Sequence, residues 1–169
     1  MSWQDYVNAY LIYNTDVNRG KTASNVCEGA AIIGNTDGTV WASSTGFNIG
    51  KYTIEIEKDD GSSEKAEIDE FQNLLDAFNN NGVATRKGGI RLNNEKYFIV
   101  SYDEERNVLY LKKSGGGAAI AKSNLAFVIG TFSNKLKAIG YNGAEEPQNP
   151  GLTNGAVESL QKFLLENSL

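Results

Sequence analysis

Three aromatic residues offer the clearest chemistry in this sequence, and that chemistry is binding. Trp3 and Tyr6 lie in the opening phrase Met1-Ser-Trp-Gln-Asp-Tyr-Val7, and Trp41 lies in the phrase Asp37-Gly-Thr-Val-Trp-Ala42. Tryptophan and tyrosine present flat, rigid faces with one polar atom each, and such faces line the grooves that bind proline-rich peptides. If these rings meet on one surface, they form such a groove. The competing interpretation is that they belong to the core.

The sequence has few of the features expected of an enzyme or a metal-binding protein. The chain has no histidine, which removes the usual general base at neutral pH and the commonest metal ligand. Its single cysteine, Cys27, cannot form an intrachain disulfide and suits a buried thiol in a reducing compartment. The clusters Asp59-Asp60 and Asp103-Glu104-Glu105 lack the spacing of a calcium loop. We expect no catalytic residue, no metal and no cofactor, and therefore not an enzyme.

One glycine-rich segment resembles a phosphate-binding loop. The segment Gly116-Gly-Ala-Ala-Ile-Ala-Lys-Ser123 differs from a P-loop at Ala121, where the motif has glycine before the lysine. A P-loop leads into a helix whose N-terminus faces the phosphate, whereas the next segment here has the pattern of a strand. A nucleotide-binding protein is kept as a competing hypothesis and is not favoured.

Composition limits the remaining classes. The chain has 169 residues, 40% of them hydrophobic and 22% charged, which is typical of one globular domain, 1–169. Its net charge of -5 gives no overall positive field for nucleic acid, so no nucleic-acid partner is expected. The sequence shows no signal peptide and no run of about 18 apolar residues that could span a bilayer. We expect a cytoplasmic protein.

The terminal segments have helical patterns. Trp3, Tyr6, Val7, Tyr10 and Leu11 recur at helical spacing, which predicts a helix over about 3–12 whose Val7, Tyr10 and Leu11 face the core. A last helix is predicted from about Thr153, and a third follows Asp69, with Phe71, Leu74, Leu75 and Phe78 at helical spacing.

Between these helices the pattern is that of short strands. Residues 14–28 read as a polar loop, and 52–67 as a polar hairpin arm that must pack on the body or pair with a partner. Residues 133–151 hold both prolines and are expected to form a surface excursion. The predicted strands are Gly29–Gly34, Thr39–Ser43, Ile90–Leu92, Tyr97–Tyr102, Val108–Lys112, Ala118–Ala121 and Leu125–Phe132.

These elements predict the fold class α+β. Sequential strands joined by tight turns favour a single antiparallel β-sheet meander. The N- and C-terminal helices are expected to pack on one face of the sheet and the further helix on the other.

The phrases, taken in order, resemble the profilin family over nearly the whole chain. The opening phrase and the Trp41 phrase are the specific matches, and Lys112-Lys113-Ser-Gly-Gly-Gly117 is a moderate one. The 52–67 arm looks like the β-hairpin insertion of some protist profilins. The resemblance implies a cytoplasmic and cytoskeletal protein that binds monomeric actin, regulates its polymerisation and binds proline-rich proteins such as formin-type elongation factors.

The resemblance also implies where these partners bind. It places the polyproline groove at Trp3, Tyr6, Trp41 and Phe163, with Leu164 and Leu169 contributing. It places the actin face on later strands and the start of the last helix, at Lys96, Phe98, Ile99, Lys113, Asn154 and Glu158. A monomer is expected, and phosphoinositide binding, which occurs in the family, is expected to be weak because the chain is acidic.

Two departures from the family pattern bear on the groove. The family commonly has tyrosine or histidine where Phe163 stands, so a polar group for a peptide carbonyl is absent there. Leu169 lacks the ring that some members have at the terminus.

The alternative function, a scaffold or trafficking interaction module of the same fold without actin binding, is kept open.

Overall fold

A seven-stranded antiparallel sheet forms the centre of the molecule. The computed structural model describes residues 2–16, 21–86 and 88–169. The strand order is β4-β3-β11-β10-β9-β8-β7, so the five later strands form a meander and β3 joins it beside β11. The bounds are β3 Gly29–Gly34, β4 Val40–Ser43, β7 Ile90–Leu92, β8 Glu95–Asp103, β9 Val108–Lys113, β10 Gly116–Lys122 and β11 Ala126–Ser133.

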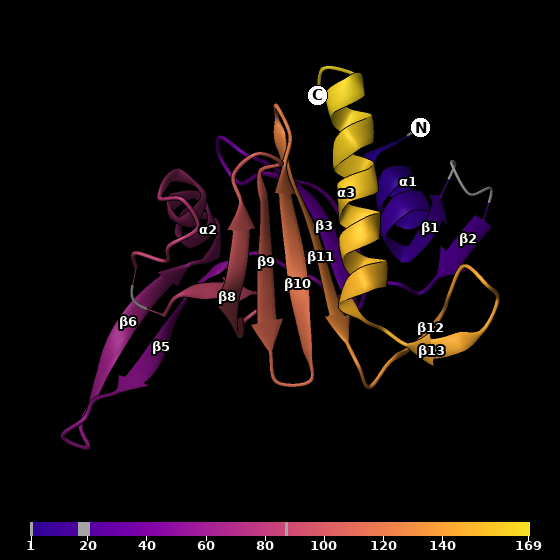
Figure 1. Cartoon of the computed structure of the whole chain (residues 1–169). Coiled ribbons are helices and arrows are strands. Elements are labelled where there is room, and N and C mark those ends of the chain that lie inside the picture. Colours follow the sequence, from indigo (N-terminus) through magenta and orange to yellow (C-terminus); the bar gives the residue numbers. More distant parts are fainter. Residues whose placement is uncertain (1, 17–20, 87) are drawn as a thin grey trace.

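Helices cover both faces of this sheet (Figure 1). The two terminal helical segments share one hydrophobic cluster with the sheet, where Val7, Leu11, Val157 and Leu160 are completely buried. On the other face, α2 (Glu70–Asn79) buries Leu74 and Phe78 in a second cluster with Phe127 and Ile129. Successive side chains of each strand therefore point alternately into two hydrophobic cores, one on each face of the sheet. The expected α+β class and helix placement are confirmed.

The N-terminal helix changes its geometry after one turn. α1 (Trp3–Tyr6) begins at the N-cap Ser2, whose hydroxyl accepts from the Asp5 amide while the Asp5 carboxylate accepts from the Ser2 amide. The chain then continues as a π-helix, η1 (Val7–Ile12). Together they span the predicted 3–12, but the wider turn of a π-helix changes which side chains share a face.

The C-terminal helix starts earlier than expected. α3 runs over Pro150–Glu166, with Asn149 as N-cap accepting from the Leu152 amide and Pro150 in the first turn. Proline fits there because the first amides of a helix have no partner within it. The predicted start near Thr153 is late because that estimate treated Pro150 as part of the excursion.

A second, small sheet corrects two expectations. Its order is β1-β2-β12-β13, with β1 Tyr13–Asp16, β2 Lys21–Ser24, β12 Lys137–Ile139 and β13 Glu145–Pro147. Residues 14–28 are thus not simply a loop, although 17–20 lie outside the described part. The 133–151 excursion is a hairpin, and its Ile139 pairs with Ser24. Its strands are only three residues long and mostly polar, so the sequence pattern did not reveal them.

The predicted arm is a separate two-stranded sheet of β5 (Lys51–Glu57) and β6 (Ser63–Asp69) that projects from the body (Figure 1). Its base is held by the carboxylate of Glu70, which is 1% exposed. This carboxylate accepts from the Tyr52 hydroxyl and from the amides of Gly50, Asn93 and Asn94. Burial, and then the bond to Glu70, raises the pKa of Tyr52 to about 12.

Removing this carboxylate should destabilise the protein. In Glu70→Ala three amides and one hydroxyl lose their acceptor at a buried site, so we expect a loss of about 3 kcal/mol in the free energy of unfolding, measured by chemical denaturation. Glu57→Ala, an exposed change on the same arm, should alter it by less than about 0.5 kcal/mol. Equal stability of the two variants would contradict this account of the arm's attachment.

Candidate binding surfaces

Five aromatic rings gather where α1, η1, α3 and β4 meet, and we call them the aromatic cluster: Trp3, Tyr6, Tyr10, Trp41 and Phe163. Trp3 lies between Trp41 and Tyr6, with ring centroids 4.8 Å and 5.6 Å away. Phe163 contacts both tyrosines, 5.4 Å from Tyr6 and 5.5 Å from Tyr10. All five rings are partly buried against the hydrophobic cluster below. Four of them are the residues that sequence comparison placed in one groove.

The strand that carries Trp41 is shaped to hold that ring. β4 is an edge strand, and its pairing with β3 is irregular between Ile32 and Ile33. A Cβ atom at Gly34 would lie 3.3 Å from Trp41 Nε1 and 3.0 Å from Asp37 Oδ1. Glycine at 34 therefore leaves room for the indole to reach Trp3.

The two leucines predicted to contribute to this surface differ in their exposure. Leu164 is completely buried, so it supports the cluster from within and is corrected to a core residue. Leu169 is partly buried against the same core, and its backbone joins Leu164 and Asn124 through hydrogen bonds. The Leu169 carbonyl accepts from the Asn124 amide, so the terminal residue is joined to the neighbouring β10–β11 turn.

Tyr10 was predicted to be core, and this prediction is wrong. Regular α-helical spacing, at 100° per residue, places Tyr10 between Tyr6 and Val7 on the apolar stripe. In the structure Val7 and Leu11 are completely buried while Tyr10 is partly exposed beside Phe163. The π-turn causes the difference, and hydrophobic periodicity carries no signal for it.

The predicted actin-face residues are split between two faces of the sheet. Phe98 on β8 is 56% exposed, as is its neighbour Val100 at 59%, which is unusual for apolar side chains on a strand. Lys96 lies over the Phe98 ring, with its Nζ 5.1 Å from the centroid. Ile99 instead packs on the α2 side. It is therefore not on the surface that Phe98 presents.

A groove of about 910 Å³ continues this surface toward the start of α3. Lys112 on β9 is exposed and pairs across the sheet with Phe98. Asn154 lines the groove from α3. Its other lining residues include Val100, Tyr110, Phe132, Pro147 and Pro150.

Two further predicted contact residues are engaged within the molecule. Lys113 donates to Glu28 at 3.1 Å and to Glu95 at 3.0 Å, its side chain is 10% exposed, and its Nζ lies 5.3 Å from the Tyr97 ring centroid. Burial lowers the pKa of Lys113, but these partners outweigh burial and raise it. The lysine is therefore a buried cation rather than a free one. The exposed cations of this surface are Lys96 and Lys112.

Glu158 is the second such residue. Its Oε1 accepts from the Tyr110 hydroxyl at 2.5 Å and lies 3.6 Å from Arg106 Nη1. Burial, and then the bond to Glu158, raises the pKa of Tyr110. Glu158 thus ties α3 to β9.

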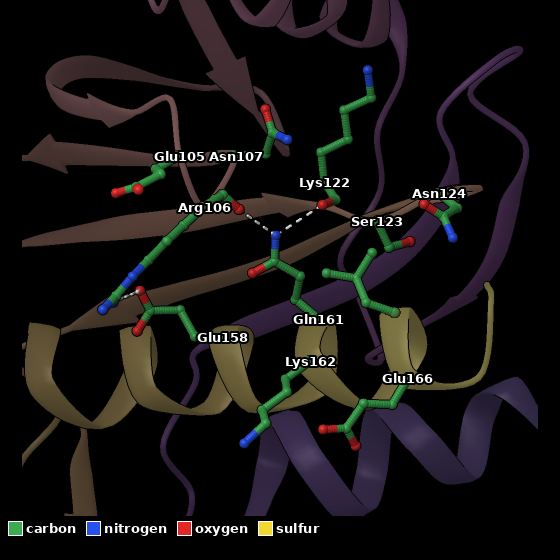
Figure 2. A pocket seen from close by; sticks show the side chains of 11 residues that line it. Glu105, Arg106, Asn107, Lys122, Ser123, Asn124, Glu158, Gln161, Lys162 and Glu166 are labelled. Carbon is green, nitrogen blue, oxygen red and sulfur yellow. Dashed lines mark hydrogen bonds and ion pairs between the residues drawn. The ribbon is translucent and has the colours of Figure 1, made fainter.

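The P-loop-like segment lies in a setting unlike a phosphate site. Gly116–Lys122 is strand β10, followed by a tight turn into β11 rather than by a helix. Lys122 and Ser123 do line a hollow of about 820 Å³, shown in Figure 2. Glu105, Glu158 and Glu166 line the same hollow as Arg106, Lys122 and Lys162, and Gln161 donates to the Arg106 and Lys122 carbonyls. This balance of charge gives no field that favours an anion.

Among the described residues, neither a metal-binding cluster nor a membrane-spanning helix is present. Within 2–16, 21–86 and 88–169, no group of three or more cysteine and acidic side chains could hold a metal ion. No helix in that part of the chain is long and apolar enough to cross a membrane.

Comparisons with known proteins by sequence and by structure all match profilins. The sequence model of the family described as Profilin matches residues 1–169. A profilin of Tetrahymena pyriformis is 45% identical over 165 residues, which cover 96% of this chain and 95% of the relative. Acanthamoeba castellanii profilin IA is structurally similar, with a TM-score of 0.64 at 26% identity, covering 99% of this chain and all of that chain. Mouse profilin IIa, solved in complex with a double repeat from the FH1 domain of mDia1, has the same fold, with a TM-score of 0.54 at 18% identity over the whole of both chains.

The paired state of Lys113 leads to a stability prediction. Lys113→Ala leaves Glu28 and Glu95 without their shared cation, so we expect a loss of about 1 to 2 kcal/mol in the free energy of unfolding, measured by urea denaturation. The adjacent exposed Lys112→Ala should cost less than about 0.5 kcal/mol. A reversed order of the two variants would refute the assignment of Lys113 as the buried cation.

Proposed function

Because the chain belongs to the profilin family, we propose that it binds monomeric actin on one surface and proline-rich segments on another, and so regulates actin polymerisation. The observation that carries this proposal is the aromatic cluster. Three sequence-distant pairs of rings, Trp3 with Trp41, Tyr6 with Phe163 and Tyr10 with Phe163, have centroids 4.8 to 5.5 Å apart. All of these rings remain partly exposed, whereas rings that only filled a core would be fully buried.

The cluster suits a polyproline II helix for physical reasons. That helix has about 3.1 Å rise per residue and no internal hydrogen bonds, so its rings and carbonyls face outward. The centroid steps of 4.8, 5.6 and 5.4 Å from Trp41 through Trp3 and Tyr6 to Phe163 are each somewhat less than two residues of such a helix. A proline ligand is already ordered, so docking on rigid rings costs little conformational entropy.

The proposed actin surface is the exposed part of β8 and β9 with the groove beside α3. Phe98 and Val100 supply apolar area, and Lys96 and Lys112 supply positive charge at its edge. Asn154 is the residue of α3 that lines this groove. Lys113, Glu158 and Ile99 act beneath the surface, by holding Tyr97, Tyr110 and the α2-side core in place.

The two surfaces can be occupied together. Trp41 lies on β4 at one edge of the seven-stranded sheet, whereas Phe98 lies on β8 near the other. A proline-rich elongation factor bound at the aromatic cluster would raise the effective concentration of the bound actin monomer at that factor. The activity is binding alone, in the cytoplasm and the cytoskeleton, with weak phosphoinositide binding at most and a monomeric protein.

A formin-type factor is the proposed class of proline-rich partner. A profilin of the same fold, from mouse, has been solved with an FH1 repeat. The 45% identical relative is itself a profilin. The alternative is a scaffold module of the same fold without actin binding. The exposed apolar side chains Phe98 and Val100 favour a protein partner at the β8 surface, and the actin assay below distinguishes the two proposals.

Reciprocal variants test the two surfaces in one design. Trp3→Ala should weaken binding of a decaproline peptide about tenfold, because it removes the ring between Trp41 and Tyr6. Phe98→Ala should weaken actin-monomer binding by about the same factor, because the ring is the largest exposed apolar group there. Peptide binding is measured by calorimetry, and actin binding by the delay of pyrene-actin polymerisation.

Each variant is the other's control. Trp3→Ala is expected to retain actin binding, and Phe98→Ala to retain peptide binding. If the wild-type protein leaves the pyrene-actin curve unchanged but binds decaproline, the scaffold alternative replaces the actin proposal. If it does neither, both parts fail.

The arm is proposed to add contact area for actin. Replacing residues 54–66 with Asn-Gly joins the paired residues Thr53 and Glu67 by a two-residue turn and leaves the Glu70 bonds at the base. We expect the shortened protein to fold and to bind actin about three- to tenfold more weakly, while its decaproline affinity is unchanged. Wild-type actin affinity would exclude the arm from the interface, and failure to fold would place the arm in the core.

A further inference from the structure

We propose that Tyr10 is a ligand-contacting residue of the aromatic cluster, and that its hydroxyl donates to a peptide carbonyl beside Phe163. This inference rests on the proposed binding of proline-rich segments. It assigns to Tyr10 the polar contact that Phe163, which has no polar side-chain atom, cannot make.

The π-turn puts Tyr10 in the required place. In an α-helix the residue four positions after Tyr6 lies about 40° past a full turn, which would carry it toward the buried stripe. Each turn of a π-helix holds more residues, so Tyr10 falls short of a full turn instead. It therefore stays on the flank of Tyr6 that faces α3, while Val7 and Leu11 take the buried flank.

The ring distances place Tyr10 and Phe163 close enough to contact the same part of a bound peptide. Tyr6, Tyr10 and Phe163 form a triangle with centroid separations of 6.2, 5.4 and 5.5 Å. A peptide leaving Tyr6 therefore meets Phe163 on the α3 side and Tyr10 on the η1 side. Tyr10 adds a ring opposite Phe163 and closes this end of the cluster.

The hydroxyl of Tyr10 is available for such a bond. Among the residues that the structure describes, no hydrogen-bond partner of the Tyr10 hydroxyl is found, whereas Tyr52, Tyr102 and Tyr110 each donate to a side-chain oxygen. A polyproline II backbone has carbonyls with no internal donor and, in a run of prolines, no amide hydrogen of its own. The chemistry that fits the hydroxyl is thus a proline-run carbonyl.

Moving one hydroxyl between two rings tests this assignment. Tyr10→Phe keeps the ring and should bind decaproline about fivefold more weakly, as expected for one lost hydrogen bond. Adding Phe163→Tyr to that variant returns a hydroxyl on the neighbouring ring, whose centroid lies 5.5 Å from that of Tyr10, and should restore the affinity to within about twofold of wild type. Affinities are measured by calorimetry on the full chain.

Tyr102→Phe is the matched control, because it removes a hydroxyl that bonds Asn107 near Phe78 on the α2 side. It should leave decaproline affinity unchanged, and all variants should keep the wild-type far-ultraviolet circular dichroism spectrum. Wild-type affinity in Tyr10→Phe, or a double variant that binds no better than Tyr10→Phe, overturns the role of Tyr10 while wild-type binding still upholds the cluster. No decaproline binding by the wild type overturns the cluster and this inference together.

Discussion

The close approach of α3 to strand β11 is the contact on which both proposed surfaces depend. A Cβ atom at Gly130 would lie 2.8 Å from Val157 Cγ2 and 3.1 Å from Cys27 Sγ, so only glycine lets the helix lie this low on the sheet. The Thr153 hydroxyl adds a further contact of α3 with the body by donating to the Val26 carbonyl at 2.8 Å. With α3 fixed there, Phe163 reaches Tyr6 and Tyr10, and Asn154 reaches the groove beside β10.

Because α3 packs closely on the sheet, polar side chains of the helix form hydrogen bonds with the strands and turns beneath it. Glu158 and Gln161 bond to β9, to the turn before it and to the end of β10, so each satisfies groups that the helix covers. The thiol of Cys27 is buried against the same helix, and burial raises its pKa to about 12. A thiol with so high a pKa is a packing group and not a nucleophile.

Sequence pattern predicted the elements with strong local signals and missed those whose strands are short and polar. The Asp69 cap, the alternation of the arm and the glycine turns of the meander are strong signals, and these elements were predicted within a few residues. The β1-β2-β12-β13 sheet was missed because its strands are only three or four residues long and lack an alternating apolar pattern. At the aromatic cluster, Trp3, Tyr6, Trp41 and Phe163 came from the family resemblance, since spacing alone left Trp3 and Trp41 ambiguous. The partial exposure of Tyr10 accompanies a π-turn that residue spacing does not reveal, and the pairing of Lys113 with Glu28 and Glu95 depends on the tertiary structure.

One helix carries residues of both surfaces, and this sets how they are related. Asn154 and Phe163 are nine residues apart on α3, which corresponds to about 14 Å along a helix axis. That helix is seated by glycine contact and buried side chains, so it holds the two surfaces at a fixed separation. Coupling between two binding sites requires an element with two arrangements that each partner favours differently, so a helix that acts as a rigid spacer would let the two partners bind independently. Cooperation between actin and a proline-rich factor would then come from effective concentration, which depends on the tether in the partner rather than on movement within this protein.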